Sequence, residues 1–553
     1  MKRTAPVGGR GDEGWAGGGN GRGANGRIAN GWAAGAARLT ILALRRDCAL
    51  VLTWTALFAG LLAGAAHSFR DVYPDAAALE AYSQAIAASP VQHFFNGPGA
   101  GLATRGGMLV FEMGGYLLTV VAVLSILTVV RHGRRVEADA TGELLRAGAV
   151  GRGALLVSAS CAAFVEAAWW GLACAATLGL TGMGWEGAAA YGASMAAAGA
   201  AYATVAALAS QLGEQPRTAT ALAGAVLAAD FAVRGVRDTH GGGPAWFSPL
   251  SWVFGLRPFA AERWWPLLAV AAFVLAGHCL AAVVVGRRDL GQGLWPARPG
   301  PVHASRGLAR PAGLVWSLRR PVALGWWAVI GGFAFADGLI AREFSQTGDS
   351  LNLYAFVGDA SGPVAALVEF AALLLAVLAA AAGVALAGGA SREEASGRLD
   401  ATLAGGIGRV RWAAAEAGCA LAGAWIALVI AVGALAGGIA LAGQWDAAGD
   451  PVGAVTAYLP AVSAVVALAV ALFGVAPRWT ALAWTPLAYG TVTGLFGAAL
   501  QLPEWADNLS PFAYAPRPPA ELVWAPSQWV LTTVAFCLAA AGAAAFRARV
   551  VNS

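Results

Sequence analysis

The sequence predicts an all-α polytopic membrane protein of about 12 transmembrane helices, built as two parallel six-helix repeats with re-entrant external hairpins. Of its 553 residues, 58% are hydrophobic and 12% are charged, whereas soluble proteins carry about 25% charged residues. Apolar runs of about 20 residues, the length of a membrane-crossing helix, recur from Ala49 to Phe546. These runs are apolar on all sides, which excludes a large soluble protein, because its helices would need polar faces.

A charged segment occurs twice, at 135–152 and at 392–409, and the two copies align without a gap. The first reads RVEADATGELLRAGAVGR and the second REEASGRLDATLAGGIGR. The identical pairs are Arg135/Arg392, Glu137/Glu394, Ala147/Ala404, Gly148/Gly405, Gly151/Gly408 and Arg152/Arg409, and Glu143/Asp400 is a conservative change. Each copy follows one long apolar run and precedes another, so we expect both to lie in water between membrane spans.

The same spacing relates two acids inside the predicted spans. Glu112 is the only acid of the second span, and Glu369 is the only acid of the eighth. The differences 369 − 112 and 409 − 152 both equal 257. This shared offset predicts a parallel duplication of six-span units about an axis along the membrane normal.

The first half is expected at 32–288, after a Gly/Asn/Arg-rich tail at 1–31 that we expect to be disordered and cytoplasmic. Residues 32–46 form either an interfacial helix or an inward extension of the first span. Within the outer loop 67–105 we expect a short surface helix. The spans of this half are predicted at 49–66, 107–130, 153–181, 187–212, 218–236 and 265–286, and the aromatic and proline-rich stretch 241–265 is predicted to be an external hairpin.

A proline-rich cytoplasmic linker at 289–313 leads to the second half, 314–549. Its plan repeats that of the first, with Ser510-Pro511 in the second hairpin where Ser248-Pro249 stands in the first. The spans are predicted at 322–340, 364–389, 413–442, 452–475, 479–500 and 528–546, with the hairpin at 502–526.

The positions of the arginines along the chain predict the membrane topology. Arginine clusters, such as those at 131–135, 287–320 and 547–549, fall on one side of the predicted membrane. Because short cytoplasmic loops are enriched in Lys and Arg, this distribution predicts that both termini lie in the cytoplasm. We expect the membrane to be the plasma membrane. The net charge of +5 therefore marks the cytoplasmic face and does not indicate a nucleic-acid partner.

Several chemistries are excluded by what the sequence lacks. Lys2 is the only lysine, so the chain has no Walker A lysine and is not itself a P-loop ATPase. The six cysteines lie in or beside apolar runs without a CxxC pair or a Cys/His cluster, which supports neither a disulfide framework nor a metal site. No set of catalytic side chains is visible, so we expect no enzymatic activity.

A few polar residues lie inside the predicted spans, where an unpaired charge is costly. Glu112 and Glu369 either line the exit of a substrate path or are interfacial carboxylates bonded to neighbouring helices. Asp230 is one helical turn from Arg234 and is expected to pair with it. His278 is expected to be a helix-contact histidine rather than a proton relay, and Glu166 and Asp337 have no assigned role.

The charged segments carry the most specific signal. Their charges either only solvate a loop or bind a partner outside the membrane, and the repetition of the terminal Gly-Arg favours the partner. The contact residues we predict are Arg135, Glu137, Glu143, Arg152, Arg392, Glu393, Glu394, Arg398, Asp400 and Arg409.

The whole chain after residue 38 resembles the permease subunit of type-2 ABC exporters, in particular the fused twelve-span permeases described as exporters of polyketide antibiotics. The motifs that carry the resemblance are RRD at 45–47, ELLRAGAVGR at 143–152, SPLSW at 248–252, RRDLGQGL at 287–294 and EEASGR at 393–398. The resemblance implies that each charged segment contains a coupling helix inserted into a cleft of a separately encoded ABC ATPase.

That ATPase, in two copies per permease, would bind ATP and Mg²⁺, so the chain itself is expected to hold no cofactor. The cargo expected from the resemblance is an apolar or amphipathic small molecule, and an ion-coupled secondary multidrug transporter is the alternative. The first segment departs from the pattern, with Val136 where the second has Glu393 and Thr141 where it has Arg398, so the two docking sites are expected to differ in strength.

Overall fold

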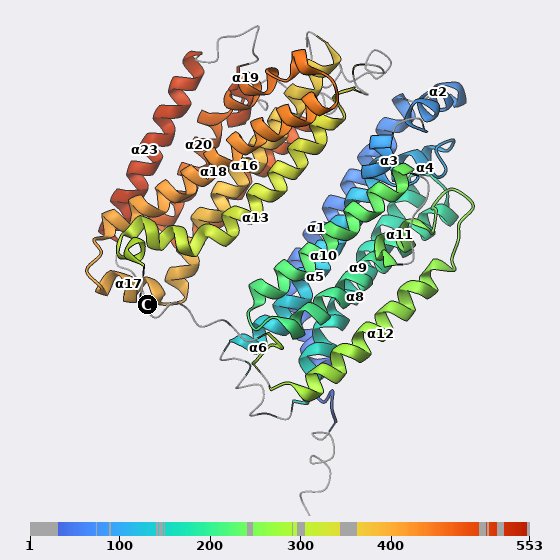
Figure 1. The fold of residues 1–553 in the computed structure, drawn as a ribbon, viewed down its shortest axis with the longest axis horizontal. Helices are drawn as coiled ribbons and strands as arrows, with labels where there is room; N and C mark the ends of the chain where they lie inside the picture. The colour runs from blue at the N-terminus through green and yellow to red at the C-terminus, as the bar shows by residue number, and fades with distance from the viewer. Residues whose placement is uncertain are drawn as a thin grey trace, which may run out of the picture. The chain divides into compact units, whose positions relative to one another are not determined.

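The computed structural model of the chain is helical and divides into two compact units, residues 1–299 and 300–553 (Figure 1). It describes residues 31–72, 75–87, 90–139, 142, 148, 150–240, 247–289, 291–295, 303, 305–342, 345, 362–496, 505, 508–516 and 525–549. Within these ranges, eleven helices are long and apolar enough to cross a membrane. The predicted all-α polytopic fold is confirmed, and the boundary between the units lies in the 289–313 linker.

The first unit is a bundle of long helices with short helices at one end. The long helices are α1 (Ala36–Val72), α5 (Gly115–Val129), α8 (Ala154–Leu180), α9 (Trp185–Leu212), α10 (Pro216–His240) and α12 (Pro266–Arg287), and the short ones include α2 (Ala76–Ala87), α3 (Pro90–Asn96) and α11 (Pro249–Phe254). Helix α9 is the most buried of them. Because α1 is continuous from Ala36, residues 36–46 extend the first span and are not a separate interfacial helix.

The second span of this unit is longer than predicted and is not a uniform α-helix. It runs through α4 (Arg105–Leu109), the π-helical η1 (Val110–Gly114), α5, the π-helical η2 (Val130–Arg135) and α6 (Val136–Ala138). Such i→i+5 turns are rare and are frequent at functional sites. They contain Glu112 in η1 and, in η2, Arg135, the first residue of the first charged segment.

The second unit contains α13 (Pro311–Leu339), α16 (Pro363–Ala395), α17 (Arg398–Ala404), α18 (Arg409–Leu441), α19 (Asp450–Thr456), α20 (Leu459–Val475), α21 (Trp484–Phe496) and α23 (Pro526–Ala548). It also has the 3₁₀ turns η4 (Arg306–Ala309), η5 (Trp445–Ala447), η6 (Pro477–Ala483) and η7 (Pro511–Tyr514). Its second span, α16, is an unbroken α-helix and the most buried helix of the unit.

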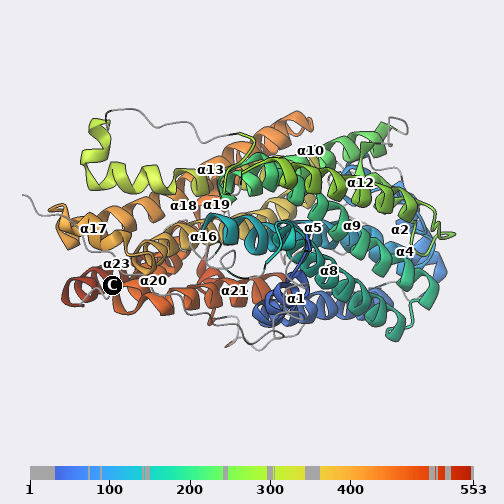
Figure 2. The same ribbon diagram turned by 90° about the horizontal axis from the view of Figure 1, so that it is seen from below.

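Two predicted spans in this unit differ from the structure. The span expected to begin at 322 begins at Pro311, and Pro321 lies inside α13. A proline removes one backbone hydrogen bond and bends a helix, and Figure 2 shows the first turns of α13 at an angle to the rest. The span expected at 479–500 is represented by η6 and the 13-residue α21, and residues 497–500 lie outside the described ranges.

Each of the two serine-proline motifs begins a short helix, α11 and the 3₁₀ turn η7. The Ser248 side chain accepts a hydrogen bond from the backbone N–H of Ser251, and the Ser510 side chain accepts one from Phe512. Each following proline occupies the first turn, where its missing N–H costs nothing. The rest of both hairpins lies partly outside the described residues.

Glycine allows the closest helix contacts. A Cβ added at Gly171 in α8 would lie 2.3 Å from the carbonyl oxygen of Gly192 in α9. A Cβ at Gly474 in α20 would lie 2.1 Å from the carbonyl oxygen of Gly542 in α23. Small residues at such crossings are the usual way in which membrane helices pack.

Candidate functional site

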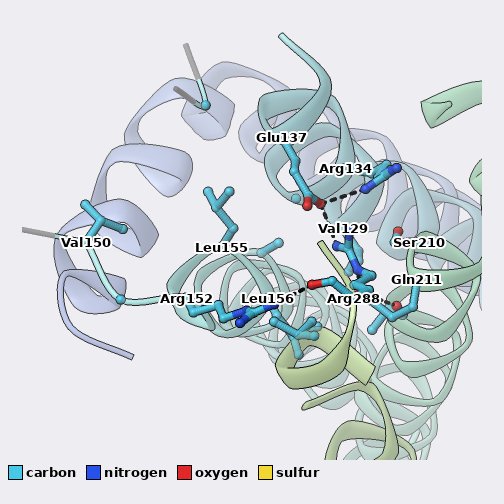
Figure 3. A pocket seen from close by; sticks show the side chains of 16 residues that line it. Val129, Arg134, Glu137, Val150, Arg152, Leu155, Leu156, Ser210, Gln211 and Arg288 are labelled. Atoms are coloured by element: carbon cyan, nitrogen blue, oxygen red, sulfur yellow. Dashed lines mark hydrogen bonds and ion pairs between the residues drawn. The ribbon is translucent and has the colours of Figure 1, made fainter. Parts of the chain in front are cut away.

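The first charged segment begins where the second span ends, and its central acid lies inside the protein. Glu137 in α6 has a side chain that is 8% exposed. Its Oε2 accepts hydrogen bonds from Arg134 Nη1 at 2.9 Å and from Arg288 Nη2 at 2.7 Å. Its Oε1 accepts one from the backbone N–H of Gly291 at 3.0 Å. Glu137 therefore joins the end of the second span to the end of α12 (Figure 3).

Both guanidinium groups are held by further acceptors. Arg134 donates from Nε to the carbonyl of Glu214 at 3.0 Å and from Nη2 to that of Gly291 at 3.1 Å. Arg288 donates from Nε to Oε1 of Gln211 at 2.9 Å. Such charge-assisted bonds are about twice as strong as neutral ones, so this end of the bundle is fixed by side chains.

Arg152, at the far end of the same segment, donates from Nη2 to the carbonyl oxygen of Arg288. Glu137 and Arg152, the acid and the last arginine of the segment, thus both bind Arg288 at the end of α12. We call this arrangement of Glu137, Arg288 and Arg152 the first clasp.

The second unit contains the same arrangement. Glu394, at the end of α16, accepts from Arg549 Nη1 at 2.7 Å and from Nη2 at 2.8 Å, one bond to each carboxylate oxygen. Arg409 donates from Nη1 to the carbonyl oxygen of Arg549 at 2.7 Å. Glu394, Arg549 and Arg409 form the second clasp. In each unit the segment is therefore fixed to the end of the last helix.

Sequence reasoning identified two residues of each clasp and missed the third. Arg288 and Arg549 stand in the basic ends of the sixth and twelfth predicted spans and were not among the predicted contact residues. The available signal was that these ends recur in both halves, as the charged segments do. The carboxylates of Glu137 and Glu394 were expected to face a partner, but each faces its own unit. Arg134 and Arg288 donate to Glu137, and Arg549 donates to Glu394.

In the second unit the charged segment forms a short helix, α17, between α16 and α18. Gly397 adopts φ +71° and allows the sharp turn after α16. Leu399 is buried against Trp412, Phe473 and Phe546, whose neighbouring ring centroids lie 5.4–5.9 Å apart. The Arg549 guanidinium lies 5.5 Å from the centroids of both phenylalanine rings. We call Trp412, Phe473 and Phe546 the aromatic seat of α17. Arg549 of the second clasp packs against this seat.

The remaining predicted contact residues lie at the surface or outside the described residues. Arg135, Arg152, Arg392, Arg398 and Arg409 are exposed, Asp400 and Glu393 are partly exposed, and Glu143 lies outside the described ranges. The Arg398 side chain is 64% exposed and bonds Glu393 from Nε at 2.9 Å. The hydrogen bond to Glu393 raises the pKa of Arg398 above its usual value.

An ion pair also fixes the first helix of each unit near this end. In α1, Asp47 accepts from Arg131 at 2.8 Å and lies 2.6 Å from His132 Nε2. In α13, Arg319 donates to Glu416 of α18 at 2.7 Å and lies 3.8 Å from Glu393. The charges are reversed between the units, because the first helix supplies the acid in one and the base in the other.

The two acids proposed for a substrate path lie far along the second span of each unit from the charged segment. Glu112 lies in η1 and accepts a hydrogen bond from the Tyr82 hydroxyl of α2. Glu369 lies in α16 and is partly buried. Their role in transport stays a prediction.

The other polar residues of the spans make helix contacts, with one correction. Asp230 does not pair with Arg234: it accepts from the Tyr202 hydroxyl and from the N–H of Leu250, so it fixes α11 to α9 and α10. Arg234 pairs with Asp238 at 3.1 Å instead, because its side chain extends one turn further along α10. His278 lies 2.9 Å from Ser160 Oγ, as a helix-contact histidine would.

Glu166 and Asp337 complete this set. Thr128 donates to Glu166 Oε2 at 2.8 Å, and Oε1 of Glu166 is buried without a partner among the described residues. Asp337 lies near the end of α13.

The fold and the duplicated clasps define the class: a polytopic α-helical membrane protein with two similar halves, typical of transport proteins. The chain is 35% identical over 527 residues to the multidrug efflux system permease protein Rv1217c of Mycobacterium tuberculosis (strain ATCC 25618 / H37Rv), covering 94% of this chain and 95% of that protein. Residues 308–547 match the family model of the Rv1217c C-terminal domain. The chain belongs to this family of multidrug efflux permeases.

Proposed function

We propose that the chain is the membrane permease of an ATP-driven ABC exporter that moves an apolar or amphipathic small molecule outward. ATP and Mg²⁺ bind to a separately encoded ATPase, in two copies, beneath the two charged segments. The chain itself supplies the path through the membrane and holds no cofactor. The end of each unit that carries its charged segment, here called the charged end, faces the cytoplasm, as do both termini.

One observation carries the proposal: both units fix their charged segment to the end of their last helix by the same clasp. If the charges of the segment served only to solvate a loop, the segment would not need to be linked to the last helix. Because each clasp combines a largely buried ion pair with a hydrogen bond from the last arginine of the segment, a displacement of the segment is passed on to the last helix. This is the mechanical link that an ATP-driven permease needs between an external motor and its membrane helices.

The contact surface on the second unit is the exposed side of α17. Its anchor, Leu399, is buried, whereas Arg398 is exposed and Asp400 partly so. Arg135 and Arg392 add exposed positive charge at the start of each segment. The carboxylates of Glu137 and Glu394 then act indirectly, by holding the segments in place.

The substrate path is proposed to run along the second span of each unit, past Glu112 and Glu369. A carboxylate in an apolar wall favours a substrate with a positive charge. The apolar remainder of the wall recognises shape through many weak contacts, which suits a multidrug range.

Purification and reconstitution test this function. A P-loop ATPase encoded beside this chain is expected to co-purify with it and to support vanadate-sensitive efflux from proteoliposomes. Transport that persists without an ATPase and is dissipated by a protonophore would instead establish the ion-coupled secondary transporter. An ATPase that co-purifies but gives no vanadate-sensitive efflux with any amphipathic substrate contradicts the proposal.

A further inference from the structure

A cavity of about 270 Å³ lies at the charged end of the first unit. It is bordered by the end of the second span, the start of α8 and the ends of α9 and α12 (Figure 3). Its volume is close to the lower limit of the pockets that hold small ligands. The first clasp forms part of its wall.

The cavity exists because the first unit has small side chains where the second has large ones. With the charged segments aligned, Gly142 stands at the position of Leu399, and Leu155 at that of Trp412. Three residues before the clasp arginine, the first unit has Val285 and the second has Phe546. In the second unit the corresponding place is filled by aromatic rings, and the cavity left there is about 20 Å³.

The polar part of the wall carries net positive charge. Arg134, Arg152 and Arg288 contribute three guanidinium groups, and Glu137 contributes the one carboxylate among the lining residues. Each side-chain nitrogen of Arg134 and Arg288 already donates to a protein acceptor, so these two residues supply positive charge beside the cavity. Arg152 is exposed, and among the described residues only its Nη2 has a partner.

A buried hydroxyl in the wall also lacks a partner. Ser210 of α9 lines the cavity, is 5% exposed, and its Oγ has no hydrogen-bond partner among the described residues. A buried polar group left unpaired is costly and calls for a bound ligand or water. The rest of the wall is apolar, with Leu155, Leu156 and Val285.

We propose that this cavity binds an anionic phospholipid, with the phosphate beside Arg152 and the start of the apolar part against Leu155, Leu156 and Val285. The cavity lies at an end of membrane-crossing helices, where lipid headgroups are found, and basic pockets between such helices suit anionic headgroups. Guanidinium groups match phosphate oxygens in charge and geometry. The inference goes beyond efflux and does not depend on ATP as the energy source.

The lipid at this place has a structural consequence. It takes the position that the aromatic seat occupies in the second unit, so it supports the first charged segment as Trp412 and Phe546 support α17. The support of one segment therefore depends on the membrane, and that of the other does not.

Native mass spectrometry of the full-length chain tests the site, with phosphatidylglycerol, phosphatidylcholine and inorganic phosphate as separate probes. Phosphatidylglycerol is expected to bind at least tenfold more tightly than either of the others. Leu155→Trp fills the cavity as Trp412 does in the second unit and should weaken that binding at least tenfold. Leu172→Trp adds the same bulk to the exposed face of the same helix and should leave the binding unchanged.

Ser210→Ala keeps the packing and removes only the hydroxyl, so it covers the case in which Leu155→Trp fails to fold. It should weaken phosphatidylglycerol binding several-fold. Equal binding of phosphatidylcholine, or inorganic phosphate bound as tightly as the lipid, would overturn the assignment to an anionic lipid. Unchanged binding in both Ser210→Ala and a folded Leu155→Trp would overturn the site itself.

Discussion

Glu394 and Arg549 form a bidentate ion pair at 2.7 and 2.8 Å, although 155 residues separate them in the chain. The pair joins the end of α16 to the end of α23. Glu137 and Arg288 make the corresponding pair in the first unit at 2.7 Å. The two units thus contain the same kind of contact between segments that are far apart in the chain.

The Glu394–Arg549 pair is expected to contribute measurably to stability. Glu394→Gln and Arg549→Gln should each lower the free energy of unfolding by about 2–3 kcal/mol, because each leaves a largely buried charge without its partner. The double substitution should cost less than the sum of the two, with a coupling of about 1–3 kcal/mol. Thermal or denaturant unfolding of the purified protein measures the cycle.

Asp446→Asn is the control for loss of a negative charge, since Asp446 lies at the surface. It should change stability by less than about 0.5 kcal/mol. Strict additivity of the Glu394 and Arg549 substitutions would show that the ion pair is not a stabilising contact.

The seat of α17 is expected to matter for coupling more than for folding. Leu399→Ala removes the side chain that packs on Trp412, Phe473 and Phe546, which costs about 2–4 kcal/mol of local packing. Since α17 is short and lies at one end of the unit, the helix should detach while the bundle stays folded. ATP-dependent efflux and stimulated ATP hydrolysis should fall about tenfold or more, because the lost packing energy exceeds the about 1.4 kcal/mol that corresponds to a factor of ten.

Ala401→Ser, on the exposed side of α17, is the matched control and should retain efflux. If Leu399→Ala unfolds the entire protein, the view of α17 as a separately docked element is wrong.

Arg398 tests the exposed contact surface. Arg398→Glu should leave the melting temperature almost unchanged, because an exposed ion pair contributes only about 0–1 kcal/mol. It should weaken binding of the ATPase about tenfold, since a like charge opposes an acidic partner surface. Pull-down of the ATPase by the purified permease measures the effect. The exposed Arg342, at the other end of the unit's first helix, gives the control Arg342→Glu, and equal losses in both variants would argue against α17 as the contact.

Close packing of α20 on α23 gives a test of the fold. Gly474→Ala would place a Cβ 2.1 Å from the carbonyl oxygen of Gly542, so the helices must separate at a cost of about 1–3 kcal/mol. Gly433→Ala meets no atom within 4 Å and should be neutral or stabilise α18 by up to about 1 kcal/mol. Thermal stability in detergent distinguishes the two variants. Unchanged stability in Gly474→Ala would contradict the close packing of α20 on α23.

Glu112 tests the substrate path. Gln can still accept the hydrogen bond from Tyr82, so Glu112→Gln should fold normally and remove only the charge. Efflux of cationic substrates should fall several-fold, and that of neutral ones should persist. Tyr82→Phe removes the hydrogen bond but keeps the carboxylate, so it should retain cation efflux. Equal loss for neutral and cationic substrates in Glu112→Gln would remove this residue from the path.

The sequence predicted the fold because membrane spans are set by local composition. Half of the predicted spans lie within about four residues of the observed helices at both ends, as for α8, α9 and α12. The errors arise where tertiary contacts decide: Pro321 is tolerated inside α13, and the second span contains two π-helical turns. Neither feature has a periodic signal in the sequence.

The candidate site was predicted only in part. The residues Glu137, Glu394, Arg152 and Arg409 were singled out by their repetition as contacts to a partner, whereas in the structure they bind Arg288 and Arg549 of their own units. A carboxylate that recurs in both halves indicates a recurring contact, but it does not show which residue makes that contact. The partners Arg288 and Arg549 lie 151 and 155 residues away from these acids, and only packing brings such distant positions together.

ATP-dependent transport by the reconstituted pair tests the central claim most directly. The purified chain and its ATPase, in proteoliposomes loaded with an amphipathic cationic drug, should give vanadate-sensitive efflux with the natural sequence. Leu399→Ala should bind the ATPase but lose most of that efflux, because the segment no longer moves the helices. Efflux that is undiminished in Leu399→Ala, or that proceeds without the ATPase, would contradict the account.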